Sequence, residues 1–343
     1  MDTRKIQQVG GGTYTVSLPK TWAESVDIEP GSVVSLHSYI DGTLVIQTGP
    51  DNDETAAPLT LSVADAEMAC IERAIRAAYA GGIGTIQLEN VDSDDKHRQI
   101  ERVARDLTGF TITESTDRTV RLRSLLDTAE VSIPQSVRQL QFAALSAHRD
   151  ATAALLGPET VENPIGRDDQ ADRIFRMVDR YFQRGLDSLP VMDDLGATRS
   201  ELFGYWITAR ELEEIADHAQ RIATVANRLD GPVEGELAAE LDELATATQE
   251  MVRDAVAVVL DDEGMSAASS VLNERDRVRT VTEQLDRDLF EQTDAEYRLT
   301  HALDSLRRTA DNAGAIAELG IRALVRDGFS TATTIAINDD AKR

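Results

Sequence analysis

The sequence contains one cysteine, Cys70, which excludes an internal disulfide, a CxxC redox motif and a thiolate zinc site. Aromatic residues make up only 4% of the 343 residues, so aliphatic side chains supply most of the apolar content, a balance that favours helix packing. The longest uninterrupted apolar run, 255–260, is far shorter than the roughly 20 residues that span a bilayer. No apolar stretch follows the first charged residues, so we expect a cytoplasmic protein without membrane insertion.

Lysine is also scarce, with 4 residues against 31 arginines, whereas acidic residues number 61 and the net charge is −26. An acidic surface with few lysines is typical of proteins that stay hydrated in concentrated salt, so we expect a halophilic source. In such a chain an acidic residue is weak evidence of function by itself.

The first fifty residues predict short β-strands and one short helix. Apolar and polar residues alternate over 13–18, Pro19 opens a helix over 20–26, and the dipeptide at 41–42 (DG) predicts a tight turn between two further strands. These elements are too small to enclose a core alone, so we expect residues 1–50 to form a dimer.

A polar linker over 51–58 leads into a region that predicts a small α/β domain, 59–130. Its helices are expected at 63–80 and 94–107, and its strands at 85–89, 110–114 and 119–123. From residue 131 to residue 328 the pattern is helical, and glycine and proline residues divide it into six helices.

An internal repeat lies within this helical region. Residues 212–223 (LEEIADHAQRIA) and 306–317 (LRRTADNAGAIA) are identical at six of twelve positions, with an offset of 94 residues. The repeat predicts two three-helix bundles, 131–230 and 233–328. The expected fold is therefore multidomain, with a β hairpin, a small α/β domain and an all-α pair of bundles.

Two pairs of carboxylates have a spacing that suggests a metal site. Glu213 and Asp217 lie one helical turn apart beside an apolar stripe, and Asp168 and Asp172 repeat that spacing on the preceding helix. Like charges at this spacing repel unless a cation neutralises them, and divalent cations take oxygen ligands. If the two helices are neighbours, the four carboxylates meet on one surface; the alternative is an ordinary solvated acidic face.

The second copy of the repeat departs from this pattern. Asp311 is the counterpart of Asp217 and is a further metal candidate. However, Arg307 replaces Glu213, and Arg279 stands where a second aspartate is wanted. We therefore expect a weaker site there, or none.

Other catalytic constellations are missing from the sequence. It contains no GxSxG, Walker A or HExxH motif, and no histidine has a glutamate three residues before it, as a di-iron site requires. We expect that the protein is not an enzyme. His148 is predicted to lie on the surface, His218 to point away from the apolar stripe, and Cys70 to be a small buried group.

The N-terminal segment is basic although the chain as a whole is strongly acidic. Arg4, Lys5 and Lys20 face only Asp2 within residues 1–23. A dimer doubles this charge, which is the footprint expected of a contact with the phosphate backbone of DNA. The alternative is a stretch that merely lacks acids.

Residues 11–22 (GGTYTVSLPKTW), 28–34 (IEPGSVV) and 41–44 (DGTL) resemble the SpoVT/AbrB swapped-hairpin family. Members of that family form intertwined dimers and commonly bind DNA through basic residues near the N-terminal strand. The resemblance implies a homodimer through the N-terminal hairpin and assigns the DNA contacts to Arg4, Lys5 and Lys20.

Residues 131–328 are similar to the PhoU family of phosphate-signalling regulators, because 212–219 (LEEIADHA) and the pair at 168 and 172 resemble its two motifs. The resemblance implies bound divalent or ferric ions, with zinc, iron, nickel and magnesium all open. It also implies partners such as the ATPase of a phosphate ABC transporter or a sensor protein. The order of the two regions resembles that of archaeal AbrB–PhoU fusions.

Together the resemblances imply a regulator of phosphate uptake and phosphate homeostasis that acts through protein partners, with DNA as a further partner. The alternative is an AbrB-type transcriptional regulator whose helices sense a ligand unrelated to phosphate transport. A carboxylate metalloenzyme is a third hypothesis, but the sequence offers it neither histidine ligands nor an identifiable nucleophile.

Overall fold

The computed structural model describes residues 3–10, 12–38, 42–48, 57–157, 165–261, 263–291 and 297–330, and their side chains except those of 165–168, 327, 329 and 330. The chain divides into two compact units, Met1–Ala56 and Ala57–Arg343. Among the described helices, none combines the length and the apolar character that crossing a membrane requires.

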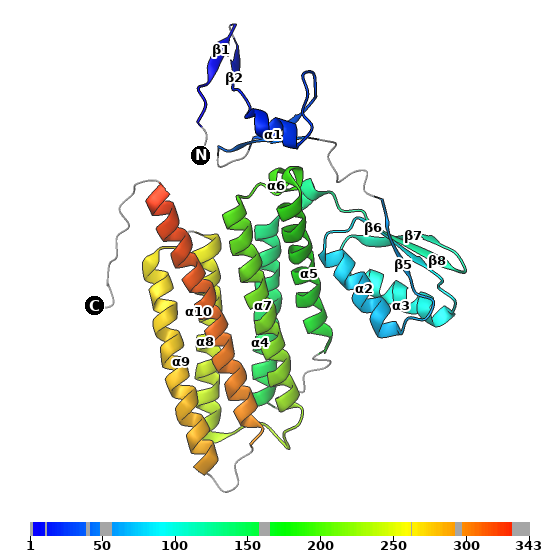
Figure 1. Cartoon of the computed structure of the whole chain (residues 1–343). Coiled ribbons are helices and arrows are strands. Elements are labelled where there is room, and N and C mark those ends of the chain that lie inside the picture. Colours follow the sequence, from blue (N-terminus) through cyan, green and yellow to red (C-terminus); the bar gives the residue numbers. More distant parts are fainter. Residues whose placement is uncertain are drawn as a thin grey trace. The chain divides into compact units, whose positions relative to one another are not determined.

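The N-terminal unit consists of two antiparallel hairpins and a short helix (Figure 1). Its elements are β1 (Gln7–Val9), β2 (Thr13–Thr15), α1 (Lys20–Ser25), β3 (Ser35–Ser38) and β4 (Leu44–Gln47). Gly10 and Gly42 have φ angles of 66° and 80°, which glycine adopts without steric cost. The three expected strands and the helix are therefore confirmed, but β1 was not predicted and β2 ends at Thr15, before the end of the alternating pattern, while Asp41 of the predicted turn lies outside the described residues.

This unit has no core of its own. None of its described residues is buried, and Tyr14 and Val33 are 71% and 92% exposed. Further apolar side chains that face solvent are Ile6, Val9, Leu36 and Leu44. So much uncovered apolar surface on a small unit is a feature of segments that pack against a partner.

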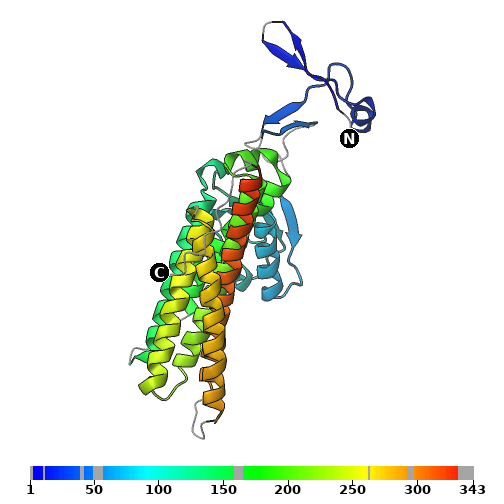
Figure 2. The same cartoon turned by 90° about the vertical axis from the view of Figure 1, so that its left-hand side faces the viewer.

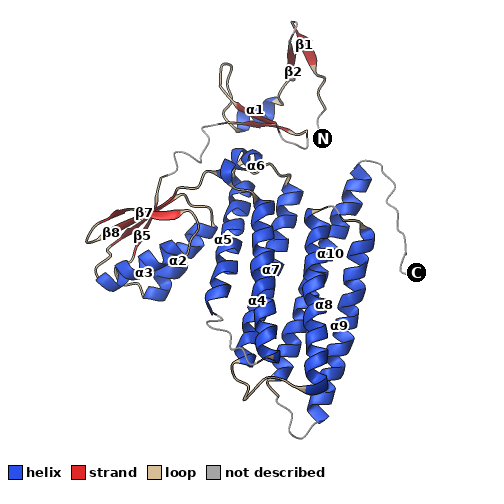
Figure 3. Cartoon of the chain, turned by 180° about the vertical axis from the view of Figure 1, so that it is seen from behind, coloured by secondary structure: helices blue, strands red, loops and turns tan. Residues whose placement is uncertain are grey.

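The α/β region forms a four-stranded sheet in the order β5-β6-β8-β7, in which only β5 and β6 are parallel. Helices α2 and α3 cover one face of it (Figure 3). Its elements are β5 (Leu59–Ser62), α2 (Met68–Ala80), β6 (Thr85–Glu89), α3 (Asp94–Arg105), β7 (Phe110–Ser115) and β8 (Thr119–Ser124).

The core of this region follows the two-residue period of its central strands. Ile86 and Leu88 on β6 and Val120 and Leu122 on β8 are fully buried against the helices, whereas their sequence neighbours are not. Two expectations fail here. Strand β5 was not predicted, and Cys70 is exposed because it lies on the face of α2 away from the sheet.

Six long helices form two bundles, which confirms the predicted helical half. The first bundle consists of α4 (Ile133–Leu156), α5 (Ile165–Asp187) and α7 (Arg199–Ala226), and the second of α8 (Gly235–Leu260), α9 (Met265–Glu291) and α10 (Leu299–Ser330). Figures 1 and 2 show them side by side, each antiparallel to the next. A short helix, α6 (Leu189–Asp194), and a 3₁₀ turn, η1 (Thr128–Glu130), complete the described elements.

Local signals explain where these helices begin. The hydroxyl of Thr198 accepts from the backbone N–H of Glu201, and the Glu201 carboxylate accepts from the N–H of Thr198, so a capping box starts α7. At the start of α4 the Ser132 hydroxyl accepts from the backbone N–H of Gln135, and Pro134 lies in the first turn.

The two bundles are joined along α7, which packs against α10, and along α4, which packs against α8. The side-chain amide of Asn312 donates to the carboxylate of Glu211 across the first of these contacts, at 2.8 Å. Burial raises the pKa of Glu211, although the hydrogen bond from Asn312 opposes that shift.

Two histidines lie inside this junction, so the expected surface position of His148 was wrong. His148 on α4 is 0% exposed and His218 on α7 is 3% exposed. Helix α7 is covered by α10 as well as by its own bundle, so its apolar stripe is not its only buried face. Burial lowers the pKa of each histidine to about 4, so both are neutral at neutral pH.

One arginine ties the α/β region to the first bundle. Arg180 on α5 is 1% exposed, and its Nη1 donates to the carbonyl oxygens of Tyr79 and Ile83 at 2.7 and 3.0 Å. Its guanidinium carbon lies 4.9 Å from the ring centroid of Tyr79 and 5.1 Å from that of Phe110. These contacts fix α5 against the α/β region.

Candidate functional site

The line of contact between α5 and α7, called the α5/α7 seam here, shows how far along the two helices the candidate carboxylates of the first bundle lie. The indole N–H of Trp206 on α7 donates to the Asp179 carboxylate on α5 at 2.8 Å. The ring of Phe182 stacks on the same indole, with centroids 4.8 Å apart and planes 15° apart. These contacts place residue 179 of one helix beside residue 206 of the other.

The register of an antiparallel pair then follows along the seam. Moving seven residues back from Asp179 and seven forward from Trp206 reaches Asp172 and Glu213, about two turns away on the same faces. Moving eleven residues, about three turns, reaches Asp168 and Asp217. In this register position 172 of α5 lies opposite position 213 of α7, and one turn further on position 168 lies opposite position 217.

Two of the candidate carboxylates on the first bundle form ion pairs with arginines. Asp172 forms an ion pair with Arg176, and Asp217 one with Arg221 at 3.5 Å, each pair being four residues apart on one helix. Glu213 is half-buried and also has a polar partner. Sequence reasoning missed the two arginines, although the Asp-x-x-x-Arg spacing is present in the sequence and predicts such pairs.

The prediction of a metal site stays untested, because the side chain of one proposed ligand, Asp168 on α5, is not described. Within the described residues, no three His, Cys, Asp or Glu side chains are grouped closely enough to hold a metal ion. That statement covers Asp172, Glu213 and Asp217 as a group of three, whereas pairs of them completed by Asp168 lie outside it.

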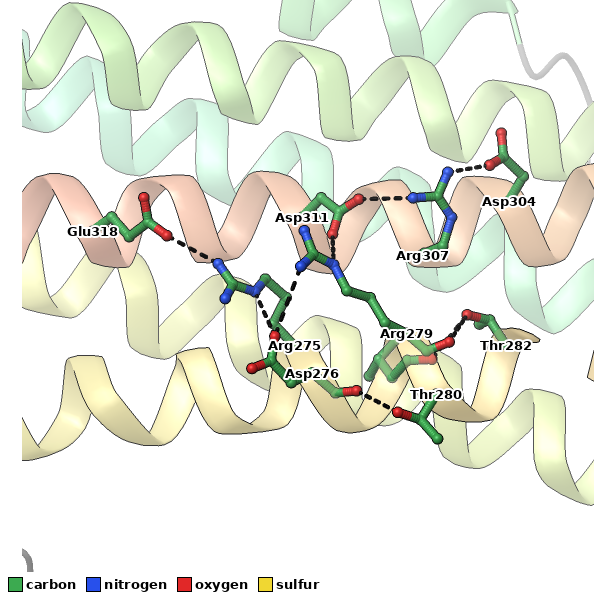
Figure 4. Close-up of polar contacts among 10 residues, drawn as sticks. Arg275, Asp276, Arg279, Thr280, Thr282, Asp304, Arg307, Asp311 and Glu318 are labelled. Carbon is green, nitrogen blue, oxygen red and sulfur yellow. Dashed lines mark hydrogen bonds and ion pairs between the residues drawn. The ribbon is translucent and has the colours of Figure 1, made fainter. Parts of the chain in front are cut away.

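The second bundle has the same seam between α9 and α10 but a different set of charges (Figure 4). Arg279 Nε on α9 donates to one oxygen of Asp311 at 2.7 Å, and Arg307 Nη1 donates to the other at 3.0 Å. Asp311 is the counterpart of Asp217, and Arg279 lies beside it as position 168 lies beside 217. Two guanidinium groups therefore occupy the positions that are acidic in the first bundle.

The network continues along α10 in both directions. Arg307 Nη2 donates to Asp304 at 2.6 Å, and Arg275 on α9 donates to Glu318 at 3.0 Å (Figure 4). Burial alone would raise the pKa of Asp304, but the hydrogen bonds from Arg307 and Arg308 outweigh it and hold that pKa below its usual value. The second bundle thus neutralises its seam with its own side chains.

The three basic candidates of the N-terminal unit all lie in exposed positions. Arg4 and Lys5 precede β1, and the Arg4 guanidinium donates to the backbone oxygen of Thr3 at 3.1 Å. Lys20 opens α1 and lies 3.4 Å from Glu24, with both side chains largely in solvent. Because Glu24 offsets the charge of Lys20, the basic segment is weaker than residues 1–23 alone indicate.

Comparisons with known proteins match two separate regions of the chain to family models. The family model of the PhoU domain matches residues 137–226, which end where α7 ends. The model described as "Antidote-toxin recognition MazE, bacterial antitoxin" matches residues 7–53. The chain therefore carries a MazE/AbrB-like domain followed by a PhoU domain.

Among solved structures, PhoU from Pseudomonas aeruginosa matches with a TM-score of 0.45 and 23% identity. The match covers 57% of this chain and 96% of the other. Among curated proteins there is no significant match.

Proposed function

We propose, from the PhoU domain and the MazE/AbrB-like domain, that this protein is a non-enzymatic, cytoplasmic regulator of phosphate uptake and phosphate homeostasis. The observation that supports the proposal best is the α5/α7 seam of the PhoU domain, where four carboxylate positions share two adjacent levels. In this proposal the helical half docks on protein partners, either the ATPase of a phosphate transporter or a sensor protein.

We propose one metal site, on the first bundle, with ligands from Asp168, Asp172, Glu213 and Asp217. Their oxygen donors suit a hard divalent or ferric cation, and a cation there would relieve the repulsion between Glu213 and Asp217. Magnesium, iron, zinc and nickel are to be distinguished by metal analysis of the purified protein. Asp311 does not fit a metal site, because Arg279 and Arg307 already hold both of its oxygens.

We propose that two copies of the N-terminal unit pair through their hairpins and contact DNA with Arg4, Lys5 and Lys20. The uncovered apolar side chains of this unit and its match to a MazE model support the pairing. Removal of residues 1–56 is expected to convert the dimer into a monomer in light scattering. An unchanged dimer would assign the contact to the helices instead.

The experiment that tests the regulatory function is a deletion of the gene, with phosphate uptake and phosphatase expression measured in phosphate-rich and phosphate-poor medium. Deletion is expected to alter one or both, and a plasmid copy is expected to restore them. Normal uptake and normal expression in both media would overturn the proposal.

The MazE/AbrB-like domain supports a second candidate function, a transcriptional regulator whose helices sense an unrelated ligand. Genome-wide occupancy of the tagged protein distinguishes the two candidates. Discrete promoter peaks away from phosphate genes, together with normal phosphate uptake in the deletion strain, would favour the second one.

A further inference from the structure

A small pocket lies where α7 ends and α10 begins, between the two bundles. It is lined by Thr224, Val225, Arg228, Tyr297, Arg298 and His301 and has a volume of about 100 Å³. Pockets for organic ligands are usually several times larger, about 300–1,000 Å³. The size therefore suits a small ion.

The charge of this pocket is unusual for the chain. Among the described residues its lining contains two arginines and a histidine but no carboxylate, although the chain holds 61 acidic residues. Two other pockets, both between α9 and α10, are lined by acids such as Asp286. Within the described part of the chain, no hydrogen bond or ion pair reaches the guanidinium of Arg228 or the ring of His301.

The basic groups come from both bundles and are held near each other. Arg298 Nη1 donates to the backbone oxygen of Arg228 at 3.1 Å, across 70 residues of sequence. The guanidinium carbon of Arg298 also lies 5.6 Å from the centroid of the Tyr297 ring. Helix α10 begins at Leu299, so the positive end of its dipole lies at the same place.

We propose that this pocket binds a tetrahedral oxyanion, and specifically free inorganic phosphate. Planar guanidinium groups bind phosphate oxygens in pairs, and the positive end of the α10 dipole favours an anion at this place. The choice of phosphate among oxyanions rests on the proposed function. Because Arg228 belongs to the first bundle and Arg298 and His301 to the second, bound phosphate would hold the two bundles together at this end.

The direct test uses the full-length protein with ¹⁵N-labelled histidines and inorganic phosphate as the probe. Phosphate replaces chloride at constant ionic strength and neutral pH. The ring resonances of His301 are expected to shift in a saturable way, while those of the buried His148 and His218 stay in place. Failure of His301 to respond at millimolar phosphate would overturn the proposal.

Calorimetry of the full-length variants tests the assignment residue by residue. Arg228→Gln with Arg298→Gln is expected to weaken phosphate binding about tenfold or more. The matched control, Arg253→Gln with Arg322→Gln, removes the same charge from exposed positions outside the pocket and is expected to change binding less than about twofold. Equal weakening by both pairs would reduce the effect to net charge and overturn the site.

A single variant and a competition experiment with ATP complete the test. His301→Gln changes an exposed side chain, so it tests the pocket even if the double variant does not fold, and about a threefold loss is expected. ATP is expected not to compete with phosphate, because the pocket is too small for a nucleotide. Binding of ATP without binding of phosphate would overturn the assignment to the free ion.

This proposal and the proposed function fail in distinguishable ways. If the deletion strain has a phosphate phenotype and the Arg228→Gln, Arg298→Gln variant restores it fully, the pocket has no role in phosphate sensing although the regulatory function holds. If phosphate binds as expected but deletion leaves phosphate uptake and phosphatase expression normal, the site holds and the proposed function fails.

Discussion

The two bundles repeat one helical plan but neutralise their equivalent seams in different ways. In the first bundle, Asp168, Asp172, Glu213 and Asp217 share two levels of the α5/α7 seam. In the second, Arg279 and Arg307 enclose Asp311. In the second bundle two guanidinium groups share one carboxylate, whereas in the first bundle Asp172 and Asp217 each pair with a single arginine four residues away.

The comparison extends beyond the seam. Only the first bundle carries the α/β region, held by Arg180, and the PhoU model matches that bundle alone. His218 of the first bundle corresponds to Asn312 of the second at the offset of 94 residues. The first bundle thus holds the contact with the α/β region and the buried histidines His148 and His218, while the second has a seam of ion pairs.

The largest effect is expected from Arg180→Met, which removes the group that ties α5 to the α/β region. The substitution leaves the Ile83 carbonyl without the Arg180 donor, removes one of the two donors to the Tyr79 carbonyl, which Gly82 N–H still bonds, and loses the contacts with two rings. We expect a loss of about 3–5 kcal/mol in the free energy of unfolding, measured in urea. Arg173→Met, at an exposed position of the same helix, is the control and is expected to have little effect.

The next effect is a pH dependence that resides in the first bundle. In the unfolded chain a histidine has a pKa near 6.5, but folding lowers that of His148 to about 4. Between these values the unfolded state binds more protons, so stability is complete above about pH 6.5 and falls as the pH drops toward 4. For fully buried His148 the loss reaches about 3 kcal/mol.

His218 adds to this dependence in the same direction. Its pKa is lowered chiefly by burial and further by Arg221 on its own helix and Arg308 on α10, while Asp304 and Asp311 oppose the shift. Glu211, whose pKa is raised by burial, contributes in the opposite sense as the pH falls. Replacement of His218 with asparagine, the residue of the second bundle, is expected to flatten the slope between pH 6.5 and 4; an unchanged slope would contradict this account.

Much of this fold could be predicted from the sequence because the signals are local. Alternating residues gave the strands, glycine and proline gave the helix ends, and two twelve-residue segments revealed the repeat. The burial of His148 and His218 could not be predicted, since it depends on which helices cover α4 and α7. Strand β5 was missed because it is a short run whose partner, β6, lies more than twenty residues away.

The candidate site was predicted only in part, for the same reason. The i,i+4 pairs are visible in the sequence, but their common level depends on the register of α5 against α7, which the Trp206–Asp179 contact reveals. The arginine partners of Asp172 and Asp217 were present in the spacing and were overlooked. The basic pocket joins Arg228 to Arg298 across 70 residues, and no local pattern predicts such a contact.

The two bundles can be compared directly by replacing the arginines around Asp311 in the second bundle with acidic residues, as in the first bundle. Arg279→Asp with Arg307→Glu leaves Asp311 among carboxylates, so we expect a loss of about 2 kcal/mol in the absence of divalent metal. Added magnesium or manganese is expected to recover most of it, because a ligand at 100 times its Kd stabilises by about 2.7 kcal/mol. Arg253→Asp with Arg322→Glu is the control for charge, and recovery of that variant by the same ions would refute a site-specific effect.

The smallest effects come from the matched pair Asp311→Asn and Asp217→Asn. Loss of the Asp311 carboxylate leaves Arg279 and Arg307 without their shared acceptor, and we expect about 1 kcal/mol of destabilisation because the site is partly exposed to solvent. Asp217 lies one turn from the like charge of Glu213 but also pairs with Arg221, so the two effects largely cancel and its neutralisation is expected to change the stability by no more than a few tenths of a kcal/mol in metal-free protein. In thermal unfolding with magnesium, manganese, iron or zinc, only Asp217→Asn is expected to lose the metal-dependent gain of the wild type. If Asp311→Asn loses that gain instead, the metal site belongs to the second bundle, and the division of labour between the bundles is reversed.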